Sequence, residues 1–132
     1  MIDETINIEK DDDIIKARQL IRKLSQEIGF DIVSQTKLIT VASELTRNVL
    51  LYAKKGILYV KSVERNEKLG LGIIVTDQGP GIDNLELILL GGYSTSGGLG
   101  KGLSGTKKLM DEFKINSEVG KGTEVKVIKW KT

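Results

Sequence analysis

A glutamate and an asparagine lie four residues apart in the segment 34–53, whose apolar residues recur with helical periodicity. Residues at this spacing are neighbours on one helix face, and Glu44 and Asn48 lie there among apolar residues, where an unpaired carboxylate is costly. The amide oxygen of Asn48 is a hard ligand suited to Mg²⁺. Glu44 can accept the proton of a hydroxyl that attacks a γ-phosphate, and Arg47 either braces Glu44 or contacts phosphate. The E-x-x-x-N spacing alone is common on helix surfaces, so this chemistry needs further support from the chain.

An aspartate ends the apolar run IIVT and enters the pattern D-x-G-x-G-I. Asp77 therefore emerges from a predicted strand beside Gly79 and Gly81, which have no Cβ to obstruct a planar ring. A carboxylate at this point can accept the amino hydrogen of adenine, whereas guanine presents a carbonyl at the same position. Such a mismatch of buried polar groups discriminates strongly, and we expect Asp77 to select the base.

The segment 77–105 holds nine of the 15 glycines of the chain. Several of them precede a predicted helix, and bare amides at a helix N-terminus suit a polyphosphate; these are Gly97, Gly98, Gly100 and Gly102. Ser94, Thr95, Ser96 and Lys101 add hydrogen-bond donors and one positive charge. The alternative is a flexible surface loop without a ligand. The segment lacks the first glycine and the Ser/Thr of a Walker loop, and its G-x-G-x-x-G match (100–105) follows no buried strand.

The composition narrows the chemistry further. The chain has no cysteine and no histidine, which removes thiol nucleophiles, thiolate metal sites and the commonest general base. Its net charge is +2 with scattered basic residues, so no nucleic-acid-binding surface is indicated. It contains neither a signal-peptide pattern nor about 20 consecutive apolar residues. We therefore expect a cytoplasmic protein that binds neither nucleic acid nor membrane.

The elements that must position these residues can be outlined from periodicity. Alternating apolar residues over 2–8 indicate an edge strand, and the stripe from Ile14 to Ile28 indicates a helix that ends at Gly29. The three aspartates 11–13 before this stripe are typical of a helix start and need no metal. A helix over 34–53 follows, then a hairpin of strands 57–63 and 69–77. Short helices over 84–90 and 103–113 and a second, C-terminal hairpin complete the chain.

This order of elements shows neither a repeat nor a regular strand–helix alternation. It predicts one α+β domain over residues 1–132, a two-layer sandwich whose mostly antiparallel mixed sheet carries helices on one face.

Three blocks in this order, ELTRN (44–48), DQGPGI (77–82) and GLGKGL (98–103), resemble the N, G1 and G2 boxes of the GHKL (Bergerat-fold) ATPases. Size and the missing histidine favour the small serine kinases of that family over gyrases, mismatch-repair ATPases and histidine autokinases. Longer strings, such as SELTRNVLLYA (43–53), YSTSGGLGKGL (93–103) and LMDEF (109–113), resemble the switch kinases of bacterial stressosomes. The resemblance covers nearly the whole chain.

The resemblance implies a serine/threonine kinase that uses ATP and Mg²⁺ to phosphorylate STAS-domain antagonist and scaffold proteins, and that activates a PP2C-type phosphatase when released. It assigns Glu44 as the base, Asn48 as the Mg²⁺ ligand, Asp77 as the adenine-binding residue and Gly79 and Gly81 as its flanks. The glycines of the third block, Gly98, Gly100 and Gly102, form the phosphate side. Thr123 stands at a position that resembles a further adenine-contacting residue of the family. Lys101 stands at a variable position of the third block.

Two alternatives remain open from the sequence. An anti-sigma-factor kinase shares the same ATP-binding boxes and differs in sequestering a sigma factor. A nucleotide-gated binding module with little turnover would use ATP only to set the shape of the glycine-rich segment, although such a module has no need of a base at Glu44.

Overall fold

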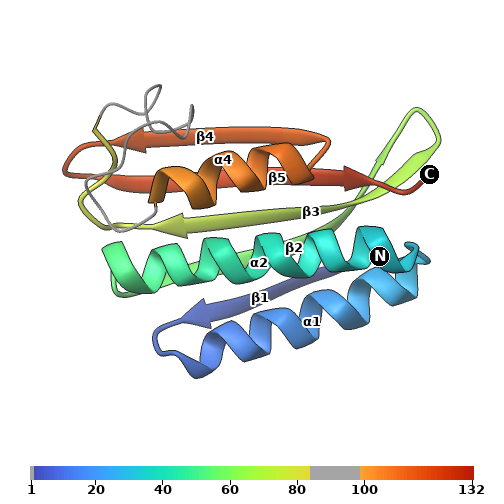
Figure 1. Cartoon of the computed structure of the whole chain (residues 1–132), viewed down its shortest axis with the longest axis horizontal. Helices are drawn as coiled ribbons and strands as arrows, with labels where there is room; N and C mark the ends of the chain where they lie inside the picture. Colours follow the sequence, from blue (N-terminus) through green and yellow to red (C-terminus); the bar gives the residue numbers. More distant parts are fainter. Residues whose placement is uncertain (1, 84–98) are drawn as a thin grey trace.

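In a computed structural model of the chain, which describes residues 2–83 and 99–132, three helices of the described part cover one face of a five-stranded sheet (Figure 1). The strand order is β1-β2-β3-β5-β4, and the four pairings are antiparallel. The elements in chain order are β1 (Asp3–Ile8), α1 (Asp12–Ile28), α2 (Ile32–Tyr52), β2 (Gly56–Arg65), β3 (Lys68–Asp77), α4 (Leu99–Leu109), β4 (Glu112–Glu118) and β5 (Gly122–Trp130). The expected α+β sandwich is confirmed, with a sheet that is antiparallel rather than mixed in these residues.

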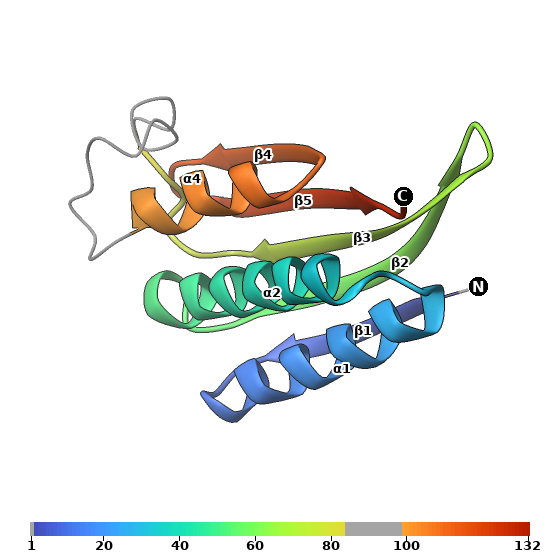
Figure 2. The same cartoon turned by 45° about the vertical axis from the view of Figure 1, so that its right-hand side comes forward.

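The two long helices follow from their apolar stripes and their end residues. α1 buries Ala17, Ile21 and Leu24 and ends at Gly29, whose φ of 96° is left-handed and favours glycine. α2 begins after Asp31, whose carboxylate accepts the backbone N–H of Ser34 at 2.7 Å. α2 packs between α1 and α4 on the same side of the sheet (Figure 2), so it lies at the centre of the helical layer.

Asp13, the last of the three aspartates 11–13, has a structural role at the connection between β1 and α1. The Asp13 side chain is buried, and its carboxylate accepts the backbone N–H groups of Glu9 at 2.8 Å and Lys10 at 3.0 Å. The hydrogen bond from Glu9 is the main cause of a lowered pKa at Asp13, and burial acts against it. Among the described residues no group of three or more Asp or Glu side chains could hold a metal ion.

The core lies between the helical layer and one face of the sheet. Alternate residues of the strands point into it, as period-two alternation requires: Leu58, Val60, Leu71, Ile73, Val75, Val125 and Val127 are all buried. The α2 residues Leu38, Val41 and Leu45 meet them. None of the helices within the described ranges has the length and apolarity needed to span a bilayer.

The helix expected over 103–113 lies four residues earlier, at Leu99–Leu109, and Phe113 belongs to β4. Sheet pairing ends the helix, because Asp111 N–H donates to Ile128 O at 3.0 Å and the Asp111 carboxylate accepts Trp130 N–H at 2.7 Å. The helix expected over 84–90 lies outside the described residues.

Trp130, the only tryptophan of the sequence, is the last residue of β5 and packs against residues of the neighbouring strands at that end of the sheet. The indole N–H donates to Glu112 at 2.9 Å, and Arg65 pairs with the same carboxylate at 2.8 Å while lying 5.2 Å from the ring centroid. The ring lies against Gly70, where a Cβ would come within 2.8 Å of it. These contacts join β2, β3, β4 and β5 at one end.

Candidate active site

A cavity of about 240 Å³ opens where the C-terminal end of α2 meets the ends of β3 and β5 and the helix α4. Its walls are mainly apolar, and three polar side chains converge on it, those of Asn48, Asp77 and Thr123. The apolar lining consists of Leu45, Val49, Leu51, Ala53, Val75, Pro80, Ile82, Leu103 and Val125, with Tyr52 beside them. The volume is below the roughly 300–1,000 Å³ typical of sites for drug-sized ligands, so it suits a planar base rather than a whole nucleotide.

Asp77 is the last residue of β3, and it is half-buried at the cavity wall. Its carboxylate accepts the backbone N–H of Gly79 at 2.9 Å. Burial raises the pKa of the Asp77 carboxyl, while the backbone N–H groups of Gly79 and Thr123 act in the opposite direction. The hydrogen bond from Gly79 N–H to one carboxylate oxygen holds the Asp77 side chain in place. The other carboxylate oxygen can accept a hydrogen bond from a ligand.

After Asp77 the backbone passes so close to neighbouring segments that Gly79 and Gly81 have no room for a side chain. A Cβ on Gly79 would come within 2.6 Å of the Ala53 Cβ. Gly81 has a φ of 79°, and a Cβ there would come within 2.3 Å of the Glu118 carbonyl oxygen. The two glycines therefore let the backbone run between the end of α2 and the turn that joins β4 to β5, where it forms one wall of the cavity.

Glu44 and Asn48 face the first turn of α4. A Cβ on Gly102 would lie 3.3 Å from Glu44 Oε2 and 3.7 Å from Asn48 Nδ2. Glu44 is held by Arg47, whose Nη1 donates to Glu44 Oε1 at 2.7 Å. Among the described residues, the buried Asn48 Nδ2 atom has no hydrogen-bond partner, which is costly unless a ligand satisfies the amide.

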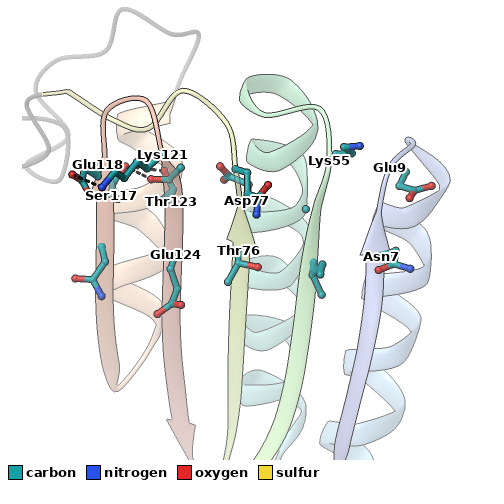
Figure 3. Close-up of a pocket in the computed structure, with 15 residues that line it drawn as sticks. Asn7, Glu9, Lys55, Thr76, Asp77, Ser117, Glu118, Lys121, Thr123 and Glu124 are labelled. Atoms are coloured by element: carbon teal, nitrogen blue, oxygen red, sulfur yellow. Dashed lines mark hydrogen bonds and ion pairs between the residues drawn. The ribbon is translucent and has the colours of Figure 1, made fainter.

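A larger cavity of about 880 Å³ lies on the open face and upper ends of all five strands (Figure 3). It shares Asp77 and Thr123 with the smaller cavity. Its lining is mostly polar and mixes charges of both signs, from Glu9, Lys55 and Lys121 among others. The apolar walls of the smaller cavity fit the face of an aromatic base better.

The comparison with protein families matches residues 33–132 to the histidine kinase-, DNA gyrase B- and HSP90-like ATPases. The chain belongs to this ATPase family. It is also 52% identical over 118 residues to the serine/threonine-protein kinase RsbT of Bacillus subtilis (strain 168), an alignment that covers 89% of each chain. An anti-sigma F factor of Thermoanaerobacter sp. (strain X514) is 26% identical over 120 residues, which cover 86% of this chain and 82% of that one.

Solved structures give the same fold. A crystal structure of RsbU and RsbW domains from Mycobacterium tuberculosis superposes with a TM-score of 0.65 at 15% identity, covering 98% of this chain and 32% of that one. The mycobacterial sensor histidine kinase MprB gives a TM-score of 0.59 at 17% identity and 98% coverage of both chains. This chain spans about a third of the former structure, so that likeness concerns the ATPase fold alone.

Within this ATPase fold, the structure brings together four of the residues expected from the sequence at one cavity. Asn48, Asp77, Gly81 and Thr123 line the cavity, while Glu44 lies one helical turn from Asn48 and outside the cavity lining. Gly100, Lys101 and Gly102 belong to the first turn of α4 instead of preceding it. This is a correction, but the N–H groups of a first turn have no partner within the helix and so remain suitable for phosphate. The expected phosphate-side residues Ser94, Thr95 and Gly98 lie outside the described residues.

One polar residue beside the 240 Å³ cavity was not predicted from the sequence. Ser117 of β4 pairs with Thr123 of β5, and their hydroxyl oxygens are 2.8 Å apart. Nothing in the composition or spacing marks Ser117, because its position beside Thr123 depends on the register of the last hairpin. The spacing of residues 117 and 123 around a Gly-Lys-Gly turn is the only available signal.

Proposed function

We propose that the chain is a cytoplasmic serine/threonine protein kinase that transfers the γ-phosphoryl group of Mg-ATP to STAS-domain antagonist and scaffold proteins. When it is released from the STAS-domain scaffold, it activates a PP2C-type phosphatase and so switches on a stress response. The ATPase family membership and the 52% identity to a kinase named RsbT support this proposal. The observation that carries it is the approach of Gly102 to both Glu44 and Asn48, because this approach joins the helix-borne polar pair to the glycine-rich block.

The adenine base lies in the 240 Å³ cavity with its amino group toward Asp77. Thr123 lies directly opposite Asp77 in the pairing of β3 with β5 and contacts the same edge of the base. The ribose and phosphates extend past Asn48 toward the first turn of α4, where the backbone N–H groups and the positive end of the helix dipole favour negative charge.

The residues present fit a magnesium ion. The Asn48 Nδ2 atom, which has no partner among the described residues, is a donor suited to a phosphate oxygen, and Oδ1 of the same amide supplies the oxygen ligand that Mg²⁺ prefers. When bound, the ion neutralises charge on the phosphate oxygens. Asn48 is the one described residue that we assign to it.

Glu44 acts as the base. The hydroxyl oxygen of the substrate serine or threonine attacks the γ-phosphorus, the bond from phosphorus to the β–γ bridging oxygen breaks, and the hydroxyl proton passes to Glu44. ADP leaves with the bridging oxygen. The partly exposed Glu44 carboxylate pairs with Arg47 at 2.7 Å, and this contact favours one orientation of the carboxylate, as the reaction requires.

The test compares the wild-type protein with Glu44→Gln in a transfer assay with labelled Mg-ATP and a recombinant STAS-domain protein. Glu44→Gln keeps the shape of the side chain, so ATP binding stays within about fivefold, while transfer falls by about 10²- to 10⁴-fold, the usual contribution of a general base. Glu27→Gln, an exposed carboxylate on α1, serves as the matched control. Full transfer by Glu44→Gln would refute the role of Glu44.

The outcome of this assay also separates the other candidates. ATP binding without transfer in the wild type favours a nucleotide-gated partner. Binding of a sigma factor in a pull-down favours the anti-sigma-factor function that the name of the 26% identical relative suggests.

A further inference from the structure

The hairpin of β2 and β3 projects beyond its neighbouring strands at the end of the sheet that is remote from the proposed ATP site. β1 pairs with β2 as far as Lys61, and β5 pairs with β3 from Gly70 onward. β2 and β3 continue to pair with each other as far as Arg65 and Lys68 (Figure 1). The tip of this hairpin therefore has no strand on either side in the part of the chain that the structure describes.

A cavity of about 530 Å³ lies between this hairpin, the residue before β1 and the end of α1. We call this cavity the distal groove. Most of the residues that line it are apolar, and its charged lining residues are both acidic. The apolar residues are Ile2, Ile28, Val63 and Leu69, and the acidic residues are Glu27 and Glu64.

Exposed apolar side chains gather at the same end of the molecule. Of the six large apolar side chains that are exposed within the described ranges, three lie here: Leu69 at 38% exposure, and Ile32 and Val33 in the first turn of α2 at 73% and 58%. The turn before α2 is next to the hairpin, because a Cβ on Gly29 would lie 3.0 Å from Lys131 Nζ and Lys131 N–H donates to Leu69 O at 2.8 Å. β-Branched residues lower helix propensity, so helix formation does not explain Ile32 and Val33. Such a gathering is typical of a site where another protein binds.

The charge of the distal groove indicates what its occupant carries. Glu27 and Glu64 are exposed, and neither forms an ion pair with another residue that the structure describes. Arg65 is the neighbour of Glu64 but points to the opposite face of the strand, where it pairs with Glu112 at 2.8 Å. An apolar groove with two available carboxylates is complementary to a segment whose apolar side chains are flanked by lysine or arginine.

The position of the groove indicates which kind of partner binds there. Leu69 and Asp77 are separated by eight residues along β3, which is about 26 Å at the usual rise of a strand. A protein that accepts a phosphoryl group must bring its hydroxyl to Glu44, on the side of the proposed ATP site. A partner that is activated without being phosphorylated has no need to reach the nucleotide.

We propose that the distal groove docks the partner that this chain activates, through an amphipathic segment of that partner whose apolar side chains are flanked by lysine or arginine. The proposal rests on the function proposed above, in which that partner is a PP2C-type phosphatase. Apolar side chains of the segment pack against Val63 and Leu69, and its cationic groups bind Glu27 and Glu64. Because the groove is separate from the nucleotide cavity, docking leaves ATP binding and phosphoryl transfer unchanged.

The test uses the whole chain, a recombinant PP2C-type phosphatase and a recombinant STAS-domain protein. Glu64→Lys reverses an exposed charge without altering the core, and we expect the dissociation constant for the phosphatase to rise about tenfold, because like charges then face each other. Leu69→Ala removes an apolar anchor and should raise it about 3- to 10-fold. Both variants should transfer phosphate from Mg-ATP to the STAS-domain protein within about twofold of the wild-type rate, because distant sites act independently.

The matched control is Glu67→Lys. It makes the same change of charge in the turn of the same hairpin, but residue 67 does not line the groove, so we expect phosphatase binding to change by about twofold at most in physiological salt. Thermal unfolding shows whether each variant remains folded.

Several results would overturn the proposal. Normal phosphatase binding by Glu64→Lys, or an equal loss in Glu67→Lys, removes its basis. Loss of transfer to the STAS-domain protein in Glu64→Lys assigns the groove to the phosphoacceptor instead. A dimer of this chain in sedimentation that Glu64→Lys dissociates, with phosphatase binding unchanged, assigns it to a second copy. A wild-type protein that binds no phosphatase refutes the activation step of the proposed function itself, which distinguishes that failure from the others.

Discussion

Gly102 provides a direct test of how α4 and α2 cooperate, because substitution by alanine affects stability and activity in opposite directions. Gly102 lies in the first turn of α4 without a left-handed φ, so alanine fits its backbone. Replacing a helical glycine by alanine stabilises a helix by about 0.5–1 kcal/mol. For a chain of 132 residues, this corresponds to a rise in Tm of about 2–4 °C.

The added methyl group also reaches the proposed catalytic pair. Its carbon would lie 3.3 Å from Glu44 Oε2, with both terminal atoms of Asn48 within 3.8 Å. The carboxylate must therefore move by a few tenths of an ångström against its ion pair with Arg47. Since a displacement of about 1 Å in a catalytic group can cost 10²-fold in rate, we expect kcat for transfer to fall about tenfold.

Gly105 supplies the matched control within the same helix. In the part of the chain that the structure describes, a Cβ on Gly105 has no neighbouring atom within 4 Å outside its own helix, so Gly105→Ala should gain the same stability and retain full activity. Thermal unfolding and single-turnover transfer from labelled Mg-ATP to a STAS-domain protein measure the two effects. Gly102→Ala with wild-type kcat, or equal losses of activity in both variants, would refute the reasoning.

Two further predictions concern carboxyl groups whose pKa values shift in opposite directions. Asp77→Asn should weaken ATP binding about 100-fold by calorimetry, since a hydrogen bond to a charged group is lost and an amide donor faces the amino group. Because burial raises the pKa of Asp77 above 3.8, this variant should be more stable than wild type at pH 7, an advantage that disappears as the pH falls through the raised pKa. Asp13→Ala should cost about 1 kcal/mol at pH 7 in urea unfolding, as for loss of a cap. Since the Asp13 pKa is lowered, the difference in unfolding free energy between wild type and Asp13→Ala should persist down to pH 3.8 and shrink as the pH falls through the lowered pKa. A difference that stays constant with pH would contradict this role of Asp13.

Periodicity and end residues made most of the fold predictable. The apolar stripe before Gly29 located α1, and the β-branched runs on both sides of a polar turn located β2 and β3. The strands are longer than predicted because backbone pairing continues to a two-residue turn at Asn66 and Glu67, whose positive φ values suit a tight hairpin.

The start of α4 could not be read from the sequence for a physical reason. Glycine disfavours helices, so Gly100 and Gly102 predict a loop. Their place in the first turn of α4 is set by packing, since the absence of a Cβ at Gly102 lets α4 approach Glu44 and Asn48 on α2. Ser117 was not predicted from the sequence for a similar reason, because its partners Ile82 and Thr123 come from two separate parts of the chain.

Trp130 gives this protein an internal optical probe at a favourable place. Thr123 and Trp130 are at opposite ends of β5, about 23 Å apart at the usual rise of a strand. Indole emission therefore reports on the integrity of the whole sheet and is insulated from a nucleotide bound at the proposed site. Unfolding curves of every variant discussed above can be recorded by fluorescence, with or without ATP, in the native sequence and without an attached dye.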